Sequence, residues 1–490
     1  MLTTCGVGRT LAAITAAACV ACGGGAAEKH PNVILISIDM LRSDHLHCYG
    51  YAQETSPNID ALAKEGVLFE QHFASSSWTL PSHAAMFTSL PDSLHGCTDT
   101  DRSLDPSAVT LAERFQAGGY ATAGFFSGPY LHPAFGLDQG FEHYEDCASY
   151  AAKIDGRPPA EWAMNKDVMV ESHQDVTNER VYGAVKKWMD ARSAKPFFLF
   201  VHLFDVHFDF VPPAPYDTKF DSSYQGWVDG KNFLFDDRYS SEMGPRDRQH
   251  LYALYDGEIA WTDSIVGRIR ADLAKAGILD DTVIAITSDH GTEFFEHGDK
   301  GHRKTLYDEV LHTPFVVRYP KRLAADRKIA DLSRGIDVGP TLLDLAGMPA
   351  PQDVFGTSLL PLVEHPGTSR VGRAVSELAS VGHNLRCVRT LKWKLLDEIG
   401  KPDHWYFDVQ HDPGEQIPMA NFDSELGKKA AAGYEAEIDM INAFSDRHDV
   451  PAAHGPRPPN VSPEVMQQLR ALGYTGTAPA PPGQNAEPPK

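Results

Sequence analysis

The sequence predicts an α/β fold, a large and mostly parallel central sheet flanked by helices, because apolar strand patterns alternate with helical ones. The first strand pattern, Asn32 to Ile38, is a continuous β-branched run of the kind that is buried on both faces of a sheet. Pro196 to Phe204 and Thr282 to Ser288 repeat this pattern. Helical patterns separate the strands: Asn58 to Glu65, Thr110 to Ala117 and Tyr252 to Ala276.

Each of these three strands ends on polar side chains. Asp39 follows the first, Asp205 and His207 follow the second, and Asp289 and His290 follow the third. Open α/β sheets bind their ligands outside the carboxyl ends of the strands. We therefore expect a functional site at this edge of the sheet.

The composition is that of a globular protein, with 42% hydrophobic and 22% charged residues in a chain of 490. We expect a main domain over residues 30–363. The strand patterns of Leu385 to Arg389 and Trp393 to Leu396 predict a smaller α+β subdomain over residues 364–474. The last sixteen residues, Thr475 to Lys490, are rich in Pro, Ala and Gly and are predicted to be a disordered tail.

The net charge of -22 argues against a nucleic-acid partner, because it repels phosphates and the sequence shows no local basic patch. Acidity by itself identifies no other partner.

Residues 1–21 have the layout of a secretory signal, with an apolar run from Thr10 to Ala21 that is too short to span a membrane. Ala21 before Cys22, with glycines following, resembles a bacterial lipoprotein cleavage site, which would leave Cys22 lipidated. An ordinary cleaved signal peptide is the alternative. In either case we expect export across the inner membrane to the periplasm, with membrane contact only through the lipid anchor.

The cysteines beyond the signal do not form a metal-binding pattern. Cys48, Cys97, Cys147 and Cys387 are widely spaced, and the chain has no Cys-x-x-Cys pair. They predict either one or two disulfides or buried free thiols.

The strongest local motif surrounds Thr79, which stands directly before Leu80-Pro81 and a helical pattern. This arrangement can expose a nucleophilic hydroxyl at a helix N-terminus, where backbone N–H groups favour anions. A plain helix cap is the alternative for these residues alone.

Asp39, Thr79, Asp289 and His290 together predict a site for one divalent cation. They supply oxygen and imidazole ligands, and Gly291 lets the backbone turn closely after the adjacent Asp and His. A cation there can lower the pKa of the Thr79 hydroxyl. Calcium, manganese and zinc all suit such ligands.

The order of motifs resembles the sulfatase branch of the alkaline phosphatase superfamily over nearly the whole mature chain. The segments that carry the resemblance are Asn32–Asp39 with Arg42, Asp44–Leu46 and Tyr49–Tyr51; Ser56–Ala63; Thr79–His83; Tyr255–Ile259; Ser288–Gly291; Gly301–Pro314; Asp337 with Pro340–Leu343; Trp405–Asp408; and Asp412–Glu415. The resemblance implies an alkaline-phosphatase-like catalytic domain over 30–363, an enzyme that hydrolyses ester bonds, and a bound divalent metal.

Three departures from the family pattern bear on the chemistry. Thr79 replaces the Cys or Ser that sulfatases convert to formylglycine, His83 replaces the motif's Arg, and Met40 replaces a second Asp. A threonine intermediate must be released by direct attack of water, which suits a phosphoryl adduct better than a sulfuryl one.

The resemblance also implies a set of groups on the substrate side. His83 takes the place of the motif's Arg, which steadies the modified residue, and His207, His302 and Lys304 stand where the family places residues that contact the transferred oxyanion or the leaving group. A second metal, held by Asp205, His207 and His302, is possible but less favoured than one.

The predicted function is hydrolysis of a phosphate mono- or diester, a phosphonate ester or a sulfate ester through Thr79. The substrate is expected to be a small molecule or an ester of a lipid or glycan. A true sulfuric ester hydrolase, a membrane-facing phosphotransferase and a non-catalytic binding protein on this scaffold are the alternatives.

Overall fold

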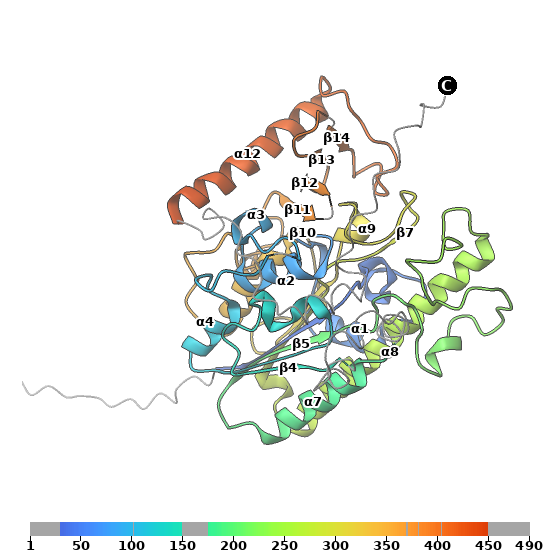
Figure 1. Ribbon diagram of the computed structural model, residues 1–490. Coiled ribbons are helices and arrows are strands. Elements are labelled where there is room, and N and C mark those ends of the chain that lie inside the picture. The colour runs from blue at the N-terminus through green and yellow to red at the C-terminus, as the bar shows by residue number, and fades with distance from the viewer. Residues whose placement is uncertain are drawn as a thin grey trace, which may run out of the picture. The chain divides into compact units, whose positions relative to one another are not determined.

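The computed structural model describes residues 30–100, 102–148, 175–368, 371–380, 382–402 and 404–448. The predicted signal, Cys22 and the predicted tail lie outside these residues. The central sheet has eight strands (Figure 1). Their spatial order is β10 (Arg327–Arg334), β2 (Val67–Phe73), β9 (Phe315–Arg318), β6 (Thr282–Thr287), β1 (Asn32–Ile38), β5 (Phe197–Leu203), β3 (Ala121–Phe126) and β4 (His143–Asp146).

The prediction of a mostly parallel sheet is confirmed. Only β9 runs antiparallel to its neighbours, β2 and β6. The three strands predicted from their apolar runs, β1, β5 and β6, are adjacent and parallel at the centre of the sheet. Their buried position explains why these sequences are apolar on both faces.

Helices cover both faces of the sheet (Figure 1). Alternate residues of β1 belong to two separate hydrophobic clusters: Val33 and Leu35 to one, Ile34 and Ile36 to the other. The first cluster includes residues of α2 (Thr79–Thr88), α4 (Leu111–Ala117) and α10 (Val338–Leu345). The second includes residues of α1 (Pro57–Lys64), α7 (Asn178–Ala191) and α8 (Pro245–Lys275).

Helix α8 begins at Pro245, earlier than the predicted start at Tyr252. Proline is tolerated in the first turn of a helix, where its missing N–H costs nothing. Thr110 caps α4 instead of belonging to it. The shorter helices are α3 (Asp92–His95), α9 (Asp308–Leu311) and α11 (Leu360–Glu364).

The C-terminal part contains a four-stranded antiparallel sheet and a long helix, as the sequence predicts for a smaller subdomain. Its elements are β11 (Ala374–Ser380), β12 (His383–Arg389), β13 (Lys394–Glu398), β14 (His404–Phe407) and α12 (Glu425–His448). One face of this sheet, with Leu378 and Leu396, belongs to the first of the two hydrophobic clusters. The other, with Val388 and Leu395, packs with residues of α12.

Strand β11 is hydrogen-bonded to the segment that leads to α2. The Glu377 N–H donates to the Ser75 carbonyl at 2.8 Å, and the Ser76 hydroxyl donates to the Glu377 carbonyl at 2.6 Å. The Ser376 hydroxyl donates to the Ala74 carbonyl at 2.6 Å. We call these three hydrogen bonds the β11 seam.

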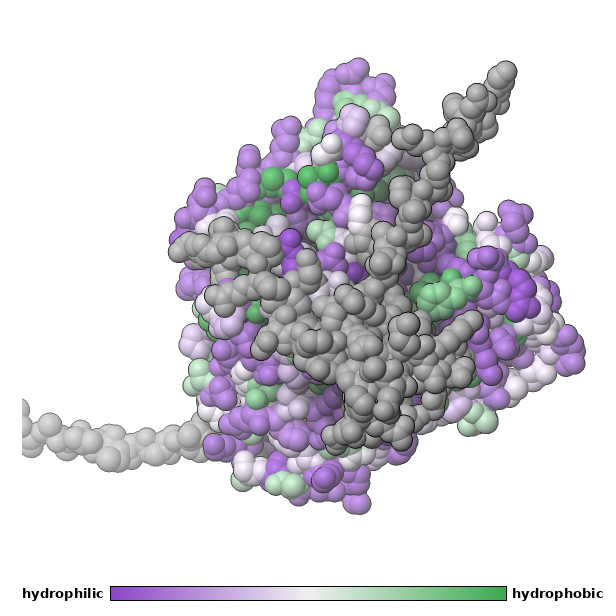
Figure 2. Space-filling view, in the orientation of Figure 1, coloured by the Kyte–Doolittle hydropathy of each residue, from purple (hydrophilic) through white to green (hydrophobic). Residues whose placement is uncertain are grey.

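All four cysteines of the described part of the chain are free, so the disulfide alternative is wrong and the free-thiol alternative is confirmed. Cys97, Cys147 and Cys387 are buried, and burial raises the pKa of the Cys387 thiol to about 11. No helix within the described ranges is long and apolar enough to cross a bilayer. Hydrophilic residues form most of the described surface that is visible in Figure 2.

A partly buried pair of a histidine and a glutamate predicts a pH dependence of stability. His297 lies between the short strands β7 (Glu293–Phe294) and β8 (Lys300–Gly301), and its Nδ1 bonds to Glu309 Oε1 at 2.6 Å. Burial opposes the charged imidazole, but the hydrogen bond and charge of Glu309 outweigh burial and raise the pKa of His297 to about 8.

Because this pKa is raised on folding, the pair stabilises the fold fully below the unfolded value of about 6.5, and the contribution is lost as pH rises through 8. Melting temperatures measured between pH 6 and 9 should therefore fall more steeply in the wild type than in His297→Gln. Parallel curves for the two proteins would contradict the assignment.

Candidate active site

The predicted site residues meet at the carboxyl edge of the central sheet. Ser37 of β1 pairs with Thr287 of β6 in parallel register, so Asp39 and Asp289, each two residues further on, leave neighbouring strands together. His290 follows directly. Asp39, Asp289 and His290 are at most 1% exposed.

Helix α2 places Thr79 over this edge. Thr79 is the first residue of the helix, because Trp78 before it is fully extended, with φ -164° and ψ 164°. The Thr79 hydroxyl lies 3.4 Å from Asp39 Oδ2 and 3.4 Å from His290 Nε2. The predicted convergence of Thr79 with the two acids and the histidine is thus present in the structure.

The spacing of these atoms suits a cation better than hydrogen bonds. His290 Nε2 lies 3.4 Å from Asp289 Oδ2 and 3.7 Å from Asp39 Oδ1. Hydroxyl hydrogen bonds usually span about 2.5–3.0 Å, whereas ligands at about 2.1 Å from a tetrahedral ion lie about 3.4 Å from one another.

Two further observations support a metal site. Asp39 Oδ1 and Asp289 Oδ2 are buried and form no hydrogen bond within the described part of the chain. His290 Nδ1 bonds to the Gly291 carbonyl at 2.9 Å, so it carries the proton and leaves Nε2 as the ligand atom. Burial raises the pKa of Asp39 to about 6, opposed by His290 and Thr79, and a bound cation would offset this cost. The residues therefore fit a divalent metal, as expected of the family.

His83 lies behind Thr79 on the next turn of α2. Its Nδ1 bonds to the Thr79 carbonyl at 2.8 Å and its Nε2 to the Ser37 hydroxyl at 3.0 Å. Burial lowers the pKa of His83 to about 4, so the imidazole is neutral. The Nδ1 bond lies within α2 and the Nε2 bond joins α2 to β1, whereas the Arg of the family motif is expected to steady the modified residue.

Two predicted substrate-side histidines stand beside His290. The His302 ring centroid lies 4.5 Å from that of His290 and 5.2 Å from that of His207. His207 Nδ1 bonds to the Phe208 carbonyl at 2.8 Å. Burial, followed by His290, lowers the pKa of His302 well below its usual value, so its imidazole is neutral.

The loop that carries His302 is bound to the segment before Thr79. The backbone N–H of Arg303 donates to the Ser77 carbonyl at 3.0 Å, and its guanidinium lies over the Trp78 ring at 4.0 Å. The ammonium of Lys304 binds Asp299 and the Lys300 carbonyl instead. The structure therefore brings His302, but not Lys304, into contact with the other site residues.

Asp205 does not join the site. Its carboxylate accepts hydrogen bonds from the backbone N–H groups of Thr177 and Asn178 and from Trp261 Nε1, which ties it to the start of α7. Asp205, the acid that a second metal would need, is therefore already hydrogen-bonded at the start of α7. This arrangement favours one metal.

Sequence reasoning missed His202, which lies within the apolar run of β5 and is fully buried. Its Nε2 is 3.3 Å from Asp39 Oδ2. A histidine inside a strand gives no signal of function unless the neighbouring strand is known. Here the register of β1 and β5 places it opposite Ser37.

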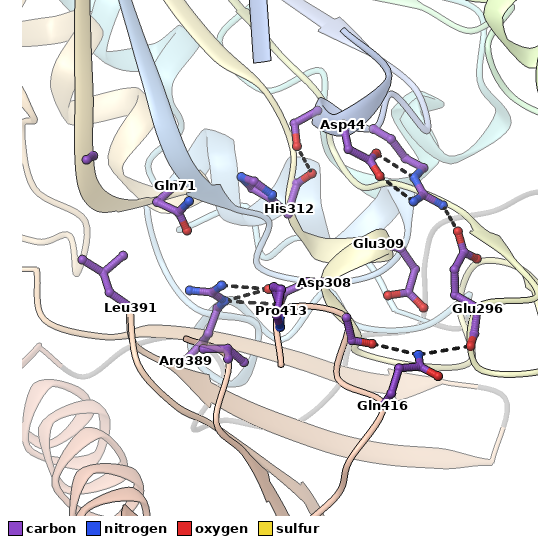
Figure 3. A pocket seen from close by; sticks show the side chains of 15 residues that line it. Asp44, Gln71, Glu296, Asp308, Glu309, His312, Arg389, Leu391, Pro413 and Gln416 are labelled. Carbon is purple, nitrogen blue, oxygen red and sulfur yellow. Dashed lines mark hydrogen bonds and ion pairs between the residues drawn. The ribbon is translucent and has the colours of Figure 1, made fainter. Parts of the chain in front are cut away.

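A separate pocket of about 560 Å³ lies beside the C-terminal subdomain, with Arg42 and Arg389 in its lining (Figure 3). Arg42 pairs with Asp44 and Glu296, and Arg389 pairs with Asp308. Each arginine of the lining is thus paired with a carboxylate of the wall, and no residue of the predicted site lines the pocket.

Gly291 is expected to be intolerant of a side chain. A Cβ at this position would lie 2.1 Å from the Glu309 carbonyl oxygen, which is backbone and cannot move aside cheaply. Gly291→Ala should therefore cost about 1–3 kcal/mol in the free energy of unfolding. Denaturant titration would check this, with Gly372→Ala as the control for an added methyl in open space. Equal stability of Gly291→Ala and the wild type would contradict the close approach.

The comparisons with known proteins agree with this geometry. The sulfatase family profile matches residues 31–348, and the profile of the C-terminal region of N-sulphoglucosamine sulphohydrolase matches residues 296–428. The chain is 24% identical over 467 residues to N-acetylglucosamine-6-O-sulfatase of Bacteroides thetaiotaomicron, covering 79% of this chain and 82% of the relative. It is 26% identical to arylsulfatase K of Gallus gallus, covering 84% and 83%.

A solved structure extends the likeness to another ester hydrolase. The phosphonate monoester hydrolase of Agrobacterium radiobacter is 25% identical and superposes with a TM-score of 0.68, covering 84% of this chain and 95% of that one. The fold and the family match agree, and the proteins named above are hydrolases of ester bonds. The chain belongs to the sulfatase family.

Proposed function

We propose that this sulfatase-family hydrolase cleaves a phosphate mono- or diester or a phosphonate ester, with Thr79 as its nucleophile and one divalent metal held by Asp39, Thr79, Asp289 and His290. The observation that supports this most directly is the Thr79 hydroxyl, 3.4 Å from both Asp39 and His290 at the start of α2. The first turn of a helix has N–H groups that favour an anion.

The nucleophile decides between reaction types. Formylglycine releases sulfate by elimination from its second hydroxyl, whereas a threonine ester has none. In the proposed reaction the Thr79 hydroxyl gives its proton to solvent and its oxygen forms a bond to phosphorus, the bond to the leaving oxygen breaks, and that oxygen takes a proton from solvent. Water then attacks phosphorus, the bond to Thr79 breaks, and the proton that the water loses goes to the Thr79 oxygen.

The residues around Thr79 have distinct roles in this proposal. The metal, when bound, withdraws charge from the transferred group and lowers the pKa of the Thr79 hydroxyl. His302 lies beside His290 and donates its N–H to a remaining oxygen of the phosphoryl group, and His207 packs against His302 and positions its ring. His83 holds the first turn of α2 against β1, which keeps the Thr79 hydroxyl in line with the substrate.

The Agrobacterium phosphonate monoester hydrolase supports the phosphorus substrates, since this chain resembles it over 84% of its length. Sulfate ester hydrolysis is the second candidate, because the two curated relatives are named sulfatases. The natural substrate in either case is a small molecule or an ester of a lipid or glycan.

The test is a panel of 4-nitrophenyl esters assayed with the purified protein: a phosphate diester, a phosphate monoester, a phosphonate ester and a sulfate ester. We expect kcat/KM for at least one phosphorus ester to exceed that for the sulfate ester by about 10-fold or more, a difference of about 1.4 kcal/mol in transition-state binding. The same protein treated with a chelator is the control. A preference for the sulfate ester in the metal-loaded protein would overturn the proposal.

A further inference from the structure

His202 is a buried polar side chain whose position is defined by the packing around it. It lies on the central strand β5, opposite Ser37 of β1, and is fully buried. Its ring meets that of His83 edge to face, with centroids 5.2 Å apart. Gly128 leaves room for it, because a Cβ at position 128 would stand 3.0 Å from the His202 Cε1 atom.

The nearest charged oxygen to this ring belongs to a candidate metal ligand. His202 Nε2 lies 3.3 Å from Asp39 Oδ2, on the same carboxylate oxygen that faces the Thr79 hydroxyl. The other oxygen, Oδ1, faces His290. The two oxygens of Asp39 therefore face different groups. Oδ2 faces His202 and Thr79, and Oδ1 faces His290.

Within the described residues, neither ring nitrogen of His202 forms a hydrogen bond of good geometry. Leaving a buried donor unpaired destabilises a fold, so an unpaired donor that a native fold retains calls for a functional explanation. The Asp39 carboxylate is within reach of that donor after a small rotation of either side chain.

We propose that His202 is a positioning residue for the metal ligand Asp39: its Nε2–H donates to Oδ2 and holds the carboxylate plane so that Oδ1 is directed at the cation. This inference rests on the proposed metal site. Histidine and carboxylate pairs in which one partner binds the metal and the other orients it are a general feature of metalloproteins.

A second cation is the rival explanation for the same residues. Ligand atoms of His83, His202 and Asp289 lie within 4.8 Å of one another. Both nitrogens of His83, however, are already bonded to Ser37 and to the Thr79 carbonyl. Only His202 and Asp289 remain, and two protein ligands are fewer than the three or four that hold a zinc-like ion.

The experiment titrates metal-free protein with Mn²⁺ alone by calorimetry, which reads affinity and stoichiometry without turnover. Gln and Asn at position 202 are compared, because Gln can place an N–H near the Nε2 position and Asn cannot reach it. We expect His202→Asn to bind Mn²⁺ about 10–100-fold more weakly than the wild type, and His202→Gln to recover most of that loss. Equal affinities for the two variants would overturn the proposal.

Two further variants separate the possible failures. His72→Phe changes an equally buried histidine on β2, away from the site, and should leave Mn²⁺ affinity unchanged. Asp39→Ala should abolish Mn²⁺ binding. If it does not, the proposed metal site itself fails. If Asp39→Ala abolishes binding while His202→Asn binds Mn²⁺ as the wild type does, only the role of His202 is wrong. A stoichiometry of two Mn²⁺ in the wild type that falls to one in His202→Asn would establish the rival second cation.

Discussion

Thr79→Ala is expected to lower turnover of every ester substrate by at least about 10³-fold while the protein still binds metal, because the variant loses the attacking oxygen but keeps three metal ligands. Asp39, Asp289 and His290 remain at most 1% exposed and close together in the wild-type fold. Stopped-flow assays with excess enzyme, together with metal analysis of the same sample, measure both parts of the prediction.

Thr79→Ser is the matched control, because it keeps a hydroxyl at the first position of α2 and removes only a methyl group. It should retain activity to within about 10²-fold of the wild type, since the serine hydroxyl must lose rotational freedom that the threonine methyl restricts. A metal-loaded Thr79→Ala variant with wild-type rates would show that another group attacks the substrate.

Asp289→Asn is expected to abolish both metal binding and turnover. The amide keeps the shape of the side chain but removes a buried charge whose Oδ2 forms no hydrogen bond within the described residues. Asp289 Oδ1 also accepts the backbone N–H of His290 at 3.0 Å, so the substitution disturbs a second ligand.

The diagnostic measurement for this variant is thermal unfolding with and without Mn²⁺. A ligand at 100 times its Kd stabilises the native state by about 2.7 kcal/mol. The wild type should gain this stabilisation and Asp289→Asn should not. Without metal the variant should be at least as stable as the wild type, because it no longer buries an unpaired carboxylate. Equal stabilisation of both proteins by Mn²⁺ would remove Asp289 from the ligand set.

The strands that build the site could be predicted because each is a long uninterrupted apolar run. β1, β5 and β6 form the centre of the sheet, where both faces are covered and only apolar side chains fit. β10 has no such signal: it lies at the sheet's edge, and exposed Lys328 and Ala330 break its pattern. β9 is only four residues long and runs against its neighbours.

Asp39, Asp289 and His290 could be identified for a similar reason, since polar residues that follow buried strands must meet at one edge of the sheet. The function of a polar residue within a strand or helix depends on what lies beside it. His202 becomes a candidate only through its distance to Asp39, and the hydrogen bond of His83 Nε2 to Ser37 depends on how α2 packs on β1. The sequence contains no local pattern for such contacts.

The β11 seam has a consequence for the exchange of parts between relatives. Its three hydrogen bonds join the C-terminal sheet to residues 74–76, just ahead of Thr79. One of them uses the hydroxyl of Ser376, which a sheet from another family member need not supply. A chimera that takes residues 364–448 from another family member should therefore keep a serine at position 376. Without it, the new sheet would lose one of the bonds that hold the segment before Thr79, even in a protein that folds.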